Sequence, residues 1–241
     1  MEQGYLSNTE LYYAYPENTR GSKILLLYEE VHHIIKVMRH RVGDRIYITS
    51  GEGTIWKCTI EGIERKQILC GIDKEIKFEK ENKNICFCLP LMKSNDRLEF
   101  AIEKLVEQGI NRFLIYSSGM GSSRSAKLDR LEKIALAAMK QSLRAYLPSI
   151  EYINSLSAIF MKSVSHVVFD QAADKSLLSF LNSDFENEKE YYFVIGPEAG
   201  FSDKENELFD DATLLKLTDN RLRSETAAIT AGAIITTSLL K

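Results

Sequence analysis

The chain has 241 residues, of which 44% are hydrophobic and 27% charged, and its formal net charge is −3, a composition typical of a soluble globular protein with one or two domains. Its first residues lack the basic and apolar stretches of a secretory signal. The longest uncharged run, 226–240, is 15 residues, shorter than the roughly 20 that a membrane helix needs, so we expect a cytoplasmic protein.

Charge is distributed unevenly along the chain. Residues 1–80 carry twelve basic and twelve acidic side chains, residues 81–150 carry eleven and seven, and residues 151–241 carry eight and fifteen. The overall charge therefore does not indicate a nucleic-acid partner. Such a partner would have to be bound by local basic patches, chiefly within the first two of these segments.

Residues 1–72 show the pattern of a small β-rich domain. Short runs of β-branched and apolar residues, separated by glycine turns, predict several strands and one short helix, which suggests a small barrel. The predicted strands span 23–27, 45–49, 54–60 and 67–71, and the predicted helix spans 28–40.

Basic side chains gather on and after this predicted helix. Lys36 and Arg39 are three residues apart and so share a helix face, and Arg41 and Arg45 follow them. One interpretation is phosphate contact, which orients RNA without reading its sequence and makes binding strongly salt dependent. The other is a solvated cationic helix face, which is common.

A second region follows residues 73–84, a stretch dense in Lys and Glu that we expect to be a linker. From residue 85 to residue 241 strands alternate with helices, which favours an α/β domain with a mainly parallel sheet and helices on both faces. Asp96 and Glu99 are spaced to cap the first of these helices, and Gly109 is placed to end it. The predicted strands span 85–89, 112–116, 150–153, 167–170, 191–195 and 213–217.

Cysteine and histidine residues do not form a metal-binding pattern. No histidine or second cysteine pair stands at ligand spacing from the cysteines, which lie in apolar, strand-like surroundings. We therefore expect buried free thiols and no metal. The cysteines are Cys58, Cys70, Cys86 and Cys88.

A glycine-bracketed loop ends the strand predicted at 191–195. It runs Gly196-Pro197-Glu198-Ala199-Gly200, and Ser202 with Glu205 then form a capping box that predicts the start of a helix. Ligands of open α/β sheets bind at the carboxyl ends of strands, so such a loop favours a ligand site. The alternative is an ordinary crossover turn without a ligand.

A second polar loop follows the strand predicted at 213–217. Residues 218–226 include Arg221 and Arg223 and lead directly into a helix rich in alanine and glycine, 227–235. The small side chains of that helix allow another backbone to approach closely.

These two loops carry a resemblance to a known family. Gly196-Pro197-Glu198-x-Gly200-Phe201-Ser202, followed by Leu222-Arg223-x-Glu225-Thr226-Ala227, resembles the signature of the RsmE-type ribosomal RNA methyltransferases of the SPOUT superfamily. The resemblance implies methylation of N3 of a uridine in 16S (small-subunit) ribosomal RNA with S-adenosylmethionine. It also implies a PUA-like RNA-binding barrel over 1–72, a trefoil-knotted α/β domain over 85–241, and a homodimer.

The resemblance also implies which residues bind the ligands. Ser123-Arg124-Ser125 and Gln141-Ser142-x-Arg144 are similar to polar stretches that line the family's RNA-facing cleft, so it adds Arg124 and Arg144 to Lys36 and Arg39 as RNA-binding candidates. The cofactor residues it implies are Ile195, Gly196, Gly200, Leu217, Asn220 and Leu222.

The chemistry of such a reaction selects three catalytic candidates. The cofactor carries an activated methyl group, so the protein must orient the acceptor and help it lose a proton. Arg223 is suited to stabilise negative charge on the uracil oxygens, and Glu225 and Glu198 are candidate bases. Alternatively, Glu225 favours its helix amino terminus and Glu198 is a turn acid.

Three positions depart from the family's pattern and leave other functions open. Ala199 and Thr218 stand where the family has glycine, and Ser123 where it has an acid. Thr218 is β-branched and could crowd the cofactor. The alternatives are another SPOUT enzyme acting on ribose or a transfer-RNA base, an RNA-binding adaptor with a degenerate cofactor pocket, and a phosphate-binding module, for which a P-loop lysine is missing.

Overall fold

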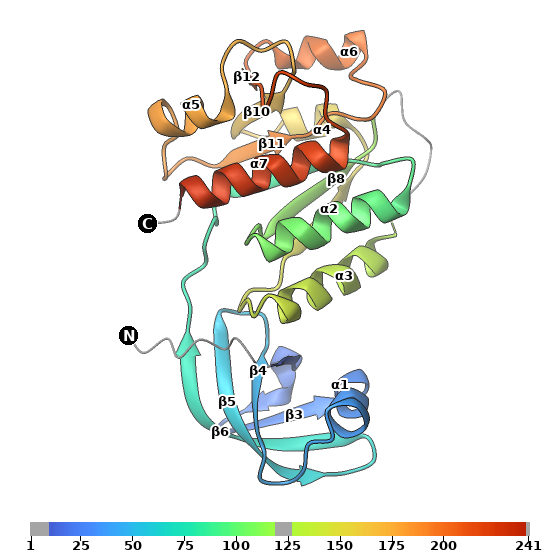
Figure 1. Ribbon diagram of the computed structural model, residues 1–241, viewed down its shortest axis with the longest axis vertical. Coiled ribbons are helices and arrows are strands. Elements are labelled where there is room, and N and C mark those ends of the chain that lie inside the picture. The colour runs from blue at the N-terminus through green and yellow to red at the C-terminus, as the bar shows by residue number, and fades with distance from the viewer. Residues whose placement is uncertain (1–9, 119–126, 240–241) are drawn as a thin grey trace. The chain divides into compact units, whose positions relative to one another are not determined.

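The computed structural model describes residues 10–118 and 127–239 (Figure 1). The chain divides into two compact units. The first is built from Met1–Lys80 together with Met139–Leu147, and the second from Glu81–Ala138 together with Pro148–Lys241. We call them the first and second unit.

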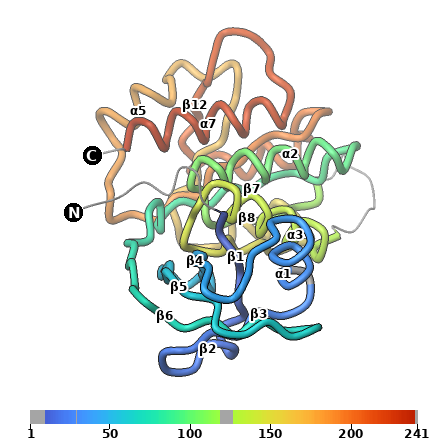
Figure 2. The backbone as a smooth tube through the Cα atoms, turned by 60° about the horizontal axis from the view of Figure 1, so that its bottom comes forward, coloured from blue at the N-terminus to red at the C-terminus, as the bar shows by residue number. Residues whose placement is uncertain are grey.

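A six-stranded sheet with the order β1-β4-β5-β6-β3-β2 forms the first unit. β1 pairs with β4 in parallel, and the remaining neighbours are antiparallel. Two irregularities in the β5–β6 register bend these long strands, as Figure 2 shows. The strands are β1 (Leu11–Tyr13), β2 (Thr19–Arg20), β3 (Lys23–Leu27), β4 (Arg45–Thr49), β5 (Thr54–Ile63) and β6 (Gln67–Lys77), with a 3₁₀ turn at Pro16–Asn18.

Alternation of buried and outward-facing residues explains this sheet. Ile46 and Ile48 of β4 and Trp56, Cys58 and Ile60 of β5 point into one buried cluster. The four strands expected in this region are confirmed, although β5 and β6 are longer. β6 continues to Lys77, so the first part of the stretch expected as a linker is paired with β5.

The helix expected at 28–40 is shorter than predicted. The structure has α1 (Glu29–His32), which continues as a π-helix, His33–Val37. Tyr28 and Arg39 flank it with φ angles of 53° and 59°. A residue in this left-handed region cannot continue a right-handed helix, so these two positions set its limits.

The second unit is an α/β domain around a six-stranded sheet of order β12-β10-β11-β7-β8-β9, in which every pairing is parallel. The predicted parallel sheet is confirmed. Its strands are β7 (Ile85–Pro90), β8 (Arg112–Tyr116), β9 (Ser149–Ile153), β10 (Ser165–Phe169), β11 (Tyr191–Val194) and β12 (Thr213–Leu215). Its helices are α2 (Asn95–Glu107), α3 (Leu128–Gln141), α4 (Leu156–Phe160), α5 (Leu177–Ser183), α6 (Asp203–Asn206) and α7 (Ser224–Ser238), and a 3₁₀ turn spans Glu207–Phe209.

Helices lie on both faces of this sheet. Cys86 and Cys88 are buried free thiols, as expected, on the face covered by α4. On the other face α2 and α7 lie side by side (Figure 1). A Cβ atom on Gly232 of α7 would collide with Leu105 of α2, so the glycine allows this close approach.

Three predicted helix ends have different outcomes. The capping box of Ser202 and Glu205 is confirmed at the start of α6. Gly109 has a φ of 97° just after the end of α2, as a terminating glycine should. The cap expected from Asp96 and Glu99 is wrong: Ser94 is the N-cap, Asp96 lies in the first turn, and Glu99 pairs with Arg130.

Candidate functional site

Two loops meet at the carboxyl edge of the second unit's sheet. One follows β11 and contains Gly196–Gly200, and the other follows β12 and leads into α7. The Ser224 hydroxyl, at the first residue of α7, donates a hydrogen bond of 2.7 Å to the carbonyl of Gly196. This bond joins the glycine loop to the arginine loop.

A cavity of about 750 Å³ lies between these loops, within the roughly 300–1,000 Å³ range of small-molecule sites. The six residues expected to bind the cofactor all line it, as do Glu198 and Arg223. Positions that were not predicted also line it, among them Arg97, Phe169, Gln171 and Phe201. The predicted residues that line it are Ile195, Gly196, Glu198, Gly200, Leu217, Asn220, Leu222 and Arg223.

Glycine shapes the first loop at two positions. Gly200 has a φ of 81° and its amide donates to the carbonyl of Pro197 at 3.0 Å, which closes a turn. A Cβ atom on Gly196 would lie 3.1 Å from the Phe201 ring. The small residue therefore lets the backbone pass close to an aromatic wall of the cavity.

The strand below the cavity is fixed from inside the core. The Tyr116 hydroxyl donates a 2.6 Å hydrogen bond to the carbonyl of Ile195. Burial raises the pKa of Tyr116 well above its ordinary value, so the hydroxyl stays protonated and remains a donor. The end of β11 is thus held at a defined position.

Arg97 holds two carboxylates beside the cavity. Its Nη1 lies 2.8 Å from an oxygen of Glu198, and its Nε lies 3.6 Å from an oxygen of Glu225. The second oxygen of Glu225 is buried and has no hydrogen-bond partner among the residues that the structure describes. Glu225 therefore presents one paired and one unpaired oxygen.

Sequence reasoning missed Arg97 because it lies 101 residues before Glu198 and still further before Glu225. The only signal was its place in the first turn of the helix that follows β7, a strand of the sheet centre. Parallel strands bring their following loops to one edge, so that turn was a candidate on topology alone.

Thr218, one of the three departures from the family pattern, makes a hydrogen bond within the second loop. Its hydroxyl accepts a hydrogen bond of 3.2 Å from the amide of Asn220, a local turn that threonine commonly forms. The same loop is held by Gln171, which donates to the carbonyl of Asp219 at 3.0 Å. Arg223 is exposed at the N-cap of α7, and its side chain makes no capping bond.

The lining combines apolar side chains, backbone groups and acids. Ile195, Leu217, Leu222 and Phe169 offer apolar surface. The charged lining residues are of both signs: Asp170, Glu198, Arg97, Arg221 and Arg223. Apolar walls with groups of both charges fit a nucleoside that itself carries both signs, and a sulfonium nucleoside with an amino-acid tail is such a molecule. In the ranges 10–118 and 127–239 no group of three His, Cys, Asp or Glu side chains could hold a metal ion.

The described RNA-binding candidates are not among the residues that line the cavity. Lys36 and Arg39 are exposed on the first unit. Arg144 is half-buried and belongs to the first unit as well, because the segment Met139–Leu147 packs there. Arg124 lies outside the described residues.

The chain is similar to known RNA methyltransferases over most of its length. The profile of the RNA methyltransferase domain matches residues 79–236, and that of the RNA methyltransferase PUA domain matches residues 29–73. Ribosomal RNA small subunit methyltransferase E of Mesomycoplasma hyopneumoniae is 32% identical over 66% of this chain and 72% of that protein. The chain belongs to this methyltransferase family.

One further relative agrees with this membership, and one solved structure agrees with the fold. Ribosomal RNA small subunit methyltransferase E of Bacillus subtilis is 27% identical over 88% of this chain and 90% of its own. The crystal structure of the Neisseria gonorrhoeae enzyme bound to S-adenosyl methionine superposes with a TM-score of 0.83, at 24% identity, over 95% of this chain and 98% of that one.

Membership in the family confirms the resemblance seen in the two loops. It confirms an RNA methyltransferase, and the α/β domain preceded by a PUA domain is confirmed as the fold. Within the described segments, no helix is long and apolar enough to cross a membrane.

Proposed function

We propose that this enzyme transfers a methyl group from S-adenosylmethionine to N3 of a uridine in 16S ribosomal RNA. The observation that carries the proposal is the cavity between the two joined loops, whose lining suits a sulfonium nucleoside. The names of the relatives support the substrate, and the ligand of the Neisseria gonorrhoeae structure supports the cofactor.

The cofactor residues in this proposal are those of the two loops. Ile195, Leu217 and Leu222 pack against the adenosine part, and the backbone of Gly196, Gly200 and Asn220 is close enough to the cavity for direct hydrogen bonds. The cofactor supplies an activated methyl group, so that the protein has only to bind and orient the two reactants. A knot in this part of the chain stays a prediction.

The three catalytic candidates divide the remaining work. N3 of uracil carries a proton at neutral pH, and we assign its removal to Glu225, whose second carboxylate oxygen is buried without a partner among the described residues. Glu198 is occupied by Arg97 and serves to position the glycine loop. Arg223 is exposed at the cavity and stabilises the charge that develops on the uracil oxygens.

RNA is bound by the basic side chains of the first unit in this proposal. Lys36, Arg39 and Arg144 contact phosphates there, and Arg124, which lies outside the described residues, is a further proposed RNA contact. The assignment of RNA binding to the first unit and of catalysis to the second is part of the proposal, as are a homodimer and a cytoplasmic location, where ribosomal RNA is found.

Two measurements test the function. Calorimetry with S-adenosylmethionine should show one site per chain, and mass spectrometry of 16S ribosomal RNA nucleosides should show 3-methyluridine only in cells that contain the protein. Arg223→Ala should bind the cofactor normally yet lose at least about a hundredfold in rate, the effect of removing one preorganised charge donor. Unchanged methylation in this variant would remove Arg223 from the mechanism.

An RNA-binding adaptor is the second candidate, motivated by Thr218 in place of glycine. The hydrogen bond from Asn220 to the Thr218 hydroxyl argues that this residue supports the loop. The adaptor predicts no measurable heat with S-adenosylmethionine and intact RNA binding, so the same titration separates the two.

A further inference from the structure

The charged side chains that line the cavity do not all neutralise one another. Arg97 and Glu198 form an ion pair at 2.8 Å. The other three, Asp170, Arg221 and Arg223, make no ion pair with any residue that the structure describes. Arg223 is assigned above to the uracil oxygens, which leaves one acid and one cation without a role. Both are exposed at the cavity, so each offers an uncompensated charge to a ligand.

Asp170 directly follows β10 and is held by backbone groups. Its amide donates to the carbonyl of Leu215 at 3.0 Å, and one of its carboxylate oxygens accepts from the amide of Ala172 at 2.8 Å, which closes a short turn. The other carboxylate oxygen makes no hydrogen bond within the described ranges. The negative charge therefore has a defined place and one oxygen ready for a donor.

Arg221 lies in the loop after β12 and reaches the glycine loop. Its Nη2 donates to the carbonyl of Glu198 at 3.5 Å, a long contact that orients the guanidinium without engaging it strongly. A guanidinium carries several N–H donors in a planar fork, and it has no acceptor. Most donors of Arg221 therefore remain for an anion in the cavity.

The segments that carry these two charges are fastened to each other. Gln171, which follows Asp170, donates to the carbonyl of Asp219 at 3.0 Å, and Asp219 lies two residues before Arg221. The bond joins the loop after β10 to the loop after β12, and these two strands are parallel neighbours in the sheet. An acid and a cation are thus presented to the cavity from adjoining loops.

We propose that Asp170 and Arg221 bind the amino-acid tail of S-adenosylmethionine, Asp170 its ammonium group and Arg221 its carboxylate. The tail carries both charges on one carbon atom, so it requires an acid and a cation close together. A guanidinium binds a carboxylate through parallel hydrogen bonds. This proposal rests on the proposed function, because it assigns residues to a part of the cofactor that the apolar lining does not recognise.

The pair gives the cavity a means of selection. Apolar side chains and backbone groups bind the adenosine part, which S-adenosylmethionine shares with ATP and with methylthioadenosine. Only the tail distinguishes the methyl donor by an ammonium group beside a carboxylate. Asp170 also repels a polyphosphate, so that it disfavours ATP while Arg221 favours the tail.

Two ligands test Arg221. Decarboxylated S-adenosylmethionine keeps the sulfonium and the amine but lacks the carboxylate. In calorimetry the wild type should bind it about five- to tenfold more weakly than S-adenosylmethionine, the effect of a charge-assisted hydrogen bond at an exposed site. Arg221→Gln should bind S-adenosylmethionine more weakly by the same factor and should not discriminate between the two ligands. Lys204→Gln removes the same charge from an exposed position of α6 outside the cavity lining, so it should discriminate like the wild type.

Asp170→Asn tests the ammonium contact. Asparagine keeps an oxygen that accepts from the amide of Ala172, so the turn is preserved. Affinity for S-adenosylmethionine should fall about five- to tenfold, whereas affinity for methylthioadenosine, which has no tail, should not change. Asp210→Asn, an exposed position outside the cavity lining, should bind both ligands like the wild type.

Other results would overturn the tail site. If Arg221→Gln binds S-adenosylmethionine like the wild type but binds ribosomal RNA more weakly, the arginine contacts a phosphate instead. If it loses affinity for both sulfonium ligands equally, the arginine only supports the loop, and an equal loss in Lys204→Gln would indicate a general effect of charge. Wild-type heat with S-adenosylmethionine and unchanged variants would refute the tail site alone. No heat with the wild type would refute the methyltransferase function as well.

Discussion

The guanidinium of Arg97 pairs with Glu198, which lines the cavity, and with Glu225 of α7, which is not among the lining residues. Arg97→Gln would leave Glu198 and Glu225 without their cation, although their side chains are only 19% and 12% exposed. Unpaired charges in such surroundings are costly, but Arg97 itself is part-exposed, so we expect a loss of about 1–2 kcal/mol in the free energy of unfolding. Weaker S-adenosylmethionine binding by calorimetry should accompany this loss.

Arg130→Gln is the matched control for that variant. It removes the same charge from an ion pair with Glu99 in the same unit, where the arginine side chain is 62% exposed. Exposed pairs contribute about 0–1 kcal/mol, so cofactor affinity should be unchanged and denaturant stability nearly so. If both variants bind the cofactor equally well, Arg97 has no positioning role. Arg97→Lys should retain part of the affinity, because it keeps the charge but not the fork.

His166 makes the second unit sensitive to acid. Burial lowers the pKa of His166 below its usual value, and its ring stacks on Phe160 at 4.4 Å between centroids. Its Nε2 contacts the carbonyl of Ile159, and Asp211 lines the same small cavity. The unfolded chain therefore binds a proton more readily than the folded chain, and stability present above about pH 6.5 falls as the pH is lowered.

Phenylalanine at position 166 keeps the ring and removes the titration. Between pH 7 and pH 5 we expect the urea midpoint of His166→Phe to fall less than that of the wild type. Above pH 7 the midpoints of the two proteins should change with pH in the same way. A constant difference between the two curves across the whole range would contradict this origin of the acid sensitivity.

Individual residues could be predicted from sequence where a local motif carries them. Gly196, Gly200, Ser202 and Glu205 belong to a turn and a capping box whose geometry is set within ten residues, so their arrangement was readable. Arg97 could not be found in this way, because it meets Glu198 and Glu225 only through the order of strands in the sheet. A charged residue in a helix's first turn has no local feature that distinguishes an ion pair from a solvated side chain.

At the scale of elements, the start of α7 joins the two loops of the cavity. Ser224→Ala removes the 2.7 Å bond to the Gly196 carbonyl from a residue that is 5% exposed. An unpaired buried acceptor costs about 1–3 kcal/mol, so we expect that loss in denaturant unfolding and a several-fold weaker cofactor affinity. Thr237→Ala near the other end of α7, where the exposed hydroxyl bonds within the helix, should leave the affinity unchanged. If the wild type, Ser224→Ala and Thr237→Ala bind S-adenosylmethionine with equal affinity, the bond between Ser224 and Gly196 does not shape the cavity.

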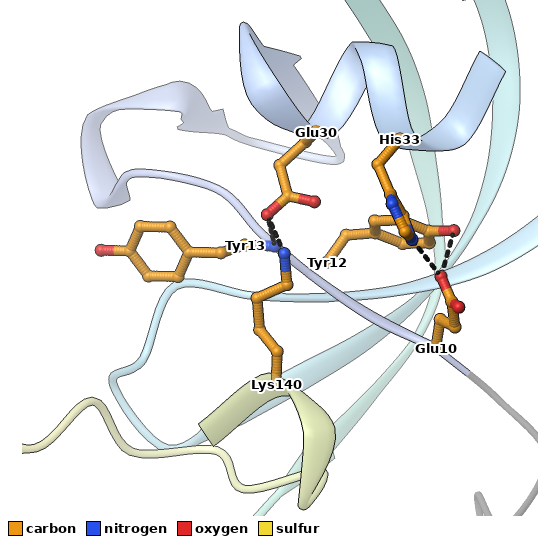
Figure 3. Close-up of polar contacts among 6 residues, drawn as sticks. All are labelled: Glu10, Tyr12, Tyr13, Glu30, His33 and Lys140. Carbon is orange, nitrogen blue, oxygen red and sulfur yellow. Dashed lines mark hydrogen bonds and ion pairs between the residues drawn. The ribbon is translucent and has the colours of Figure 1, made fainter. Parts of the chain in front are cut away.

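Element boundaries were less predictable than element types. The hydrophobic pattern around 28–40 indicates a helix, and a helix is there, but it ends at Val37 because Arg39 turns left-handed. Such a conformation at arginine costs energy locally. The helix that it ends is anchored at its start by contacts of Glu30 with Tyr13 and Lys140 (Figure 3). Those partners lie 17 and 110 residues away, beyond the reach of a local pattern.

At the scale of the molecule, the sequence indicated two regions but not the composition of the first unit. Leu143, Ala145 and Tyr146 pack with Leu11 and Ile55 in a separate buried cluster. Composition shifts only at 73–84, and nothing in the stretch 139–147 marks it as part of the earlier unit. The apolar contacts that recruit it are formed in three dimensions by residues about ninety or more positions apart.

Two units with separate cores should respond differently to the cofactor, because the cavity lies wholly in the second unit. A ligand at a hundred times its dissociation constant stabilises the state it binds by about 2.7 kcal/mol, which raises the melting temperature of a domain of this size by about 5–10 °C.

In hydrogen exchange, S-adenosylmethionine should increase the protection of amides in β11, the loop after it and the first turn of α7. Amides of β4 and β5 should exchange at unchanged rates, since a ligand stabilises only the structure whose opening releases it. The rise in melting temperature on adding S-adenosylmethionine should be smaller for Arg97→Gln than for the wild type, and for Arg130→Gln it should equal that of the wild type. An equal gain of amide protection in β4 and β5 would mean that the two units open as one. A melting-temperature rise of the same size with ATP would mean that the cavity does not select for the methyl donor.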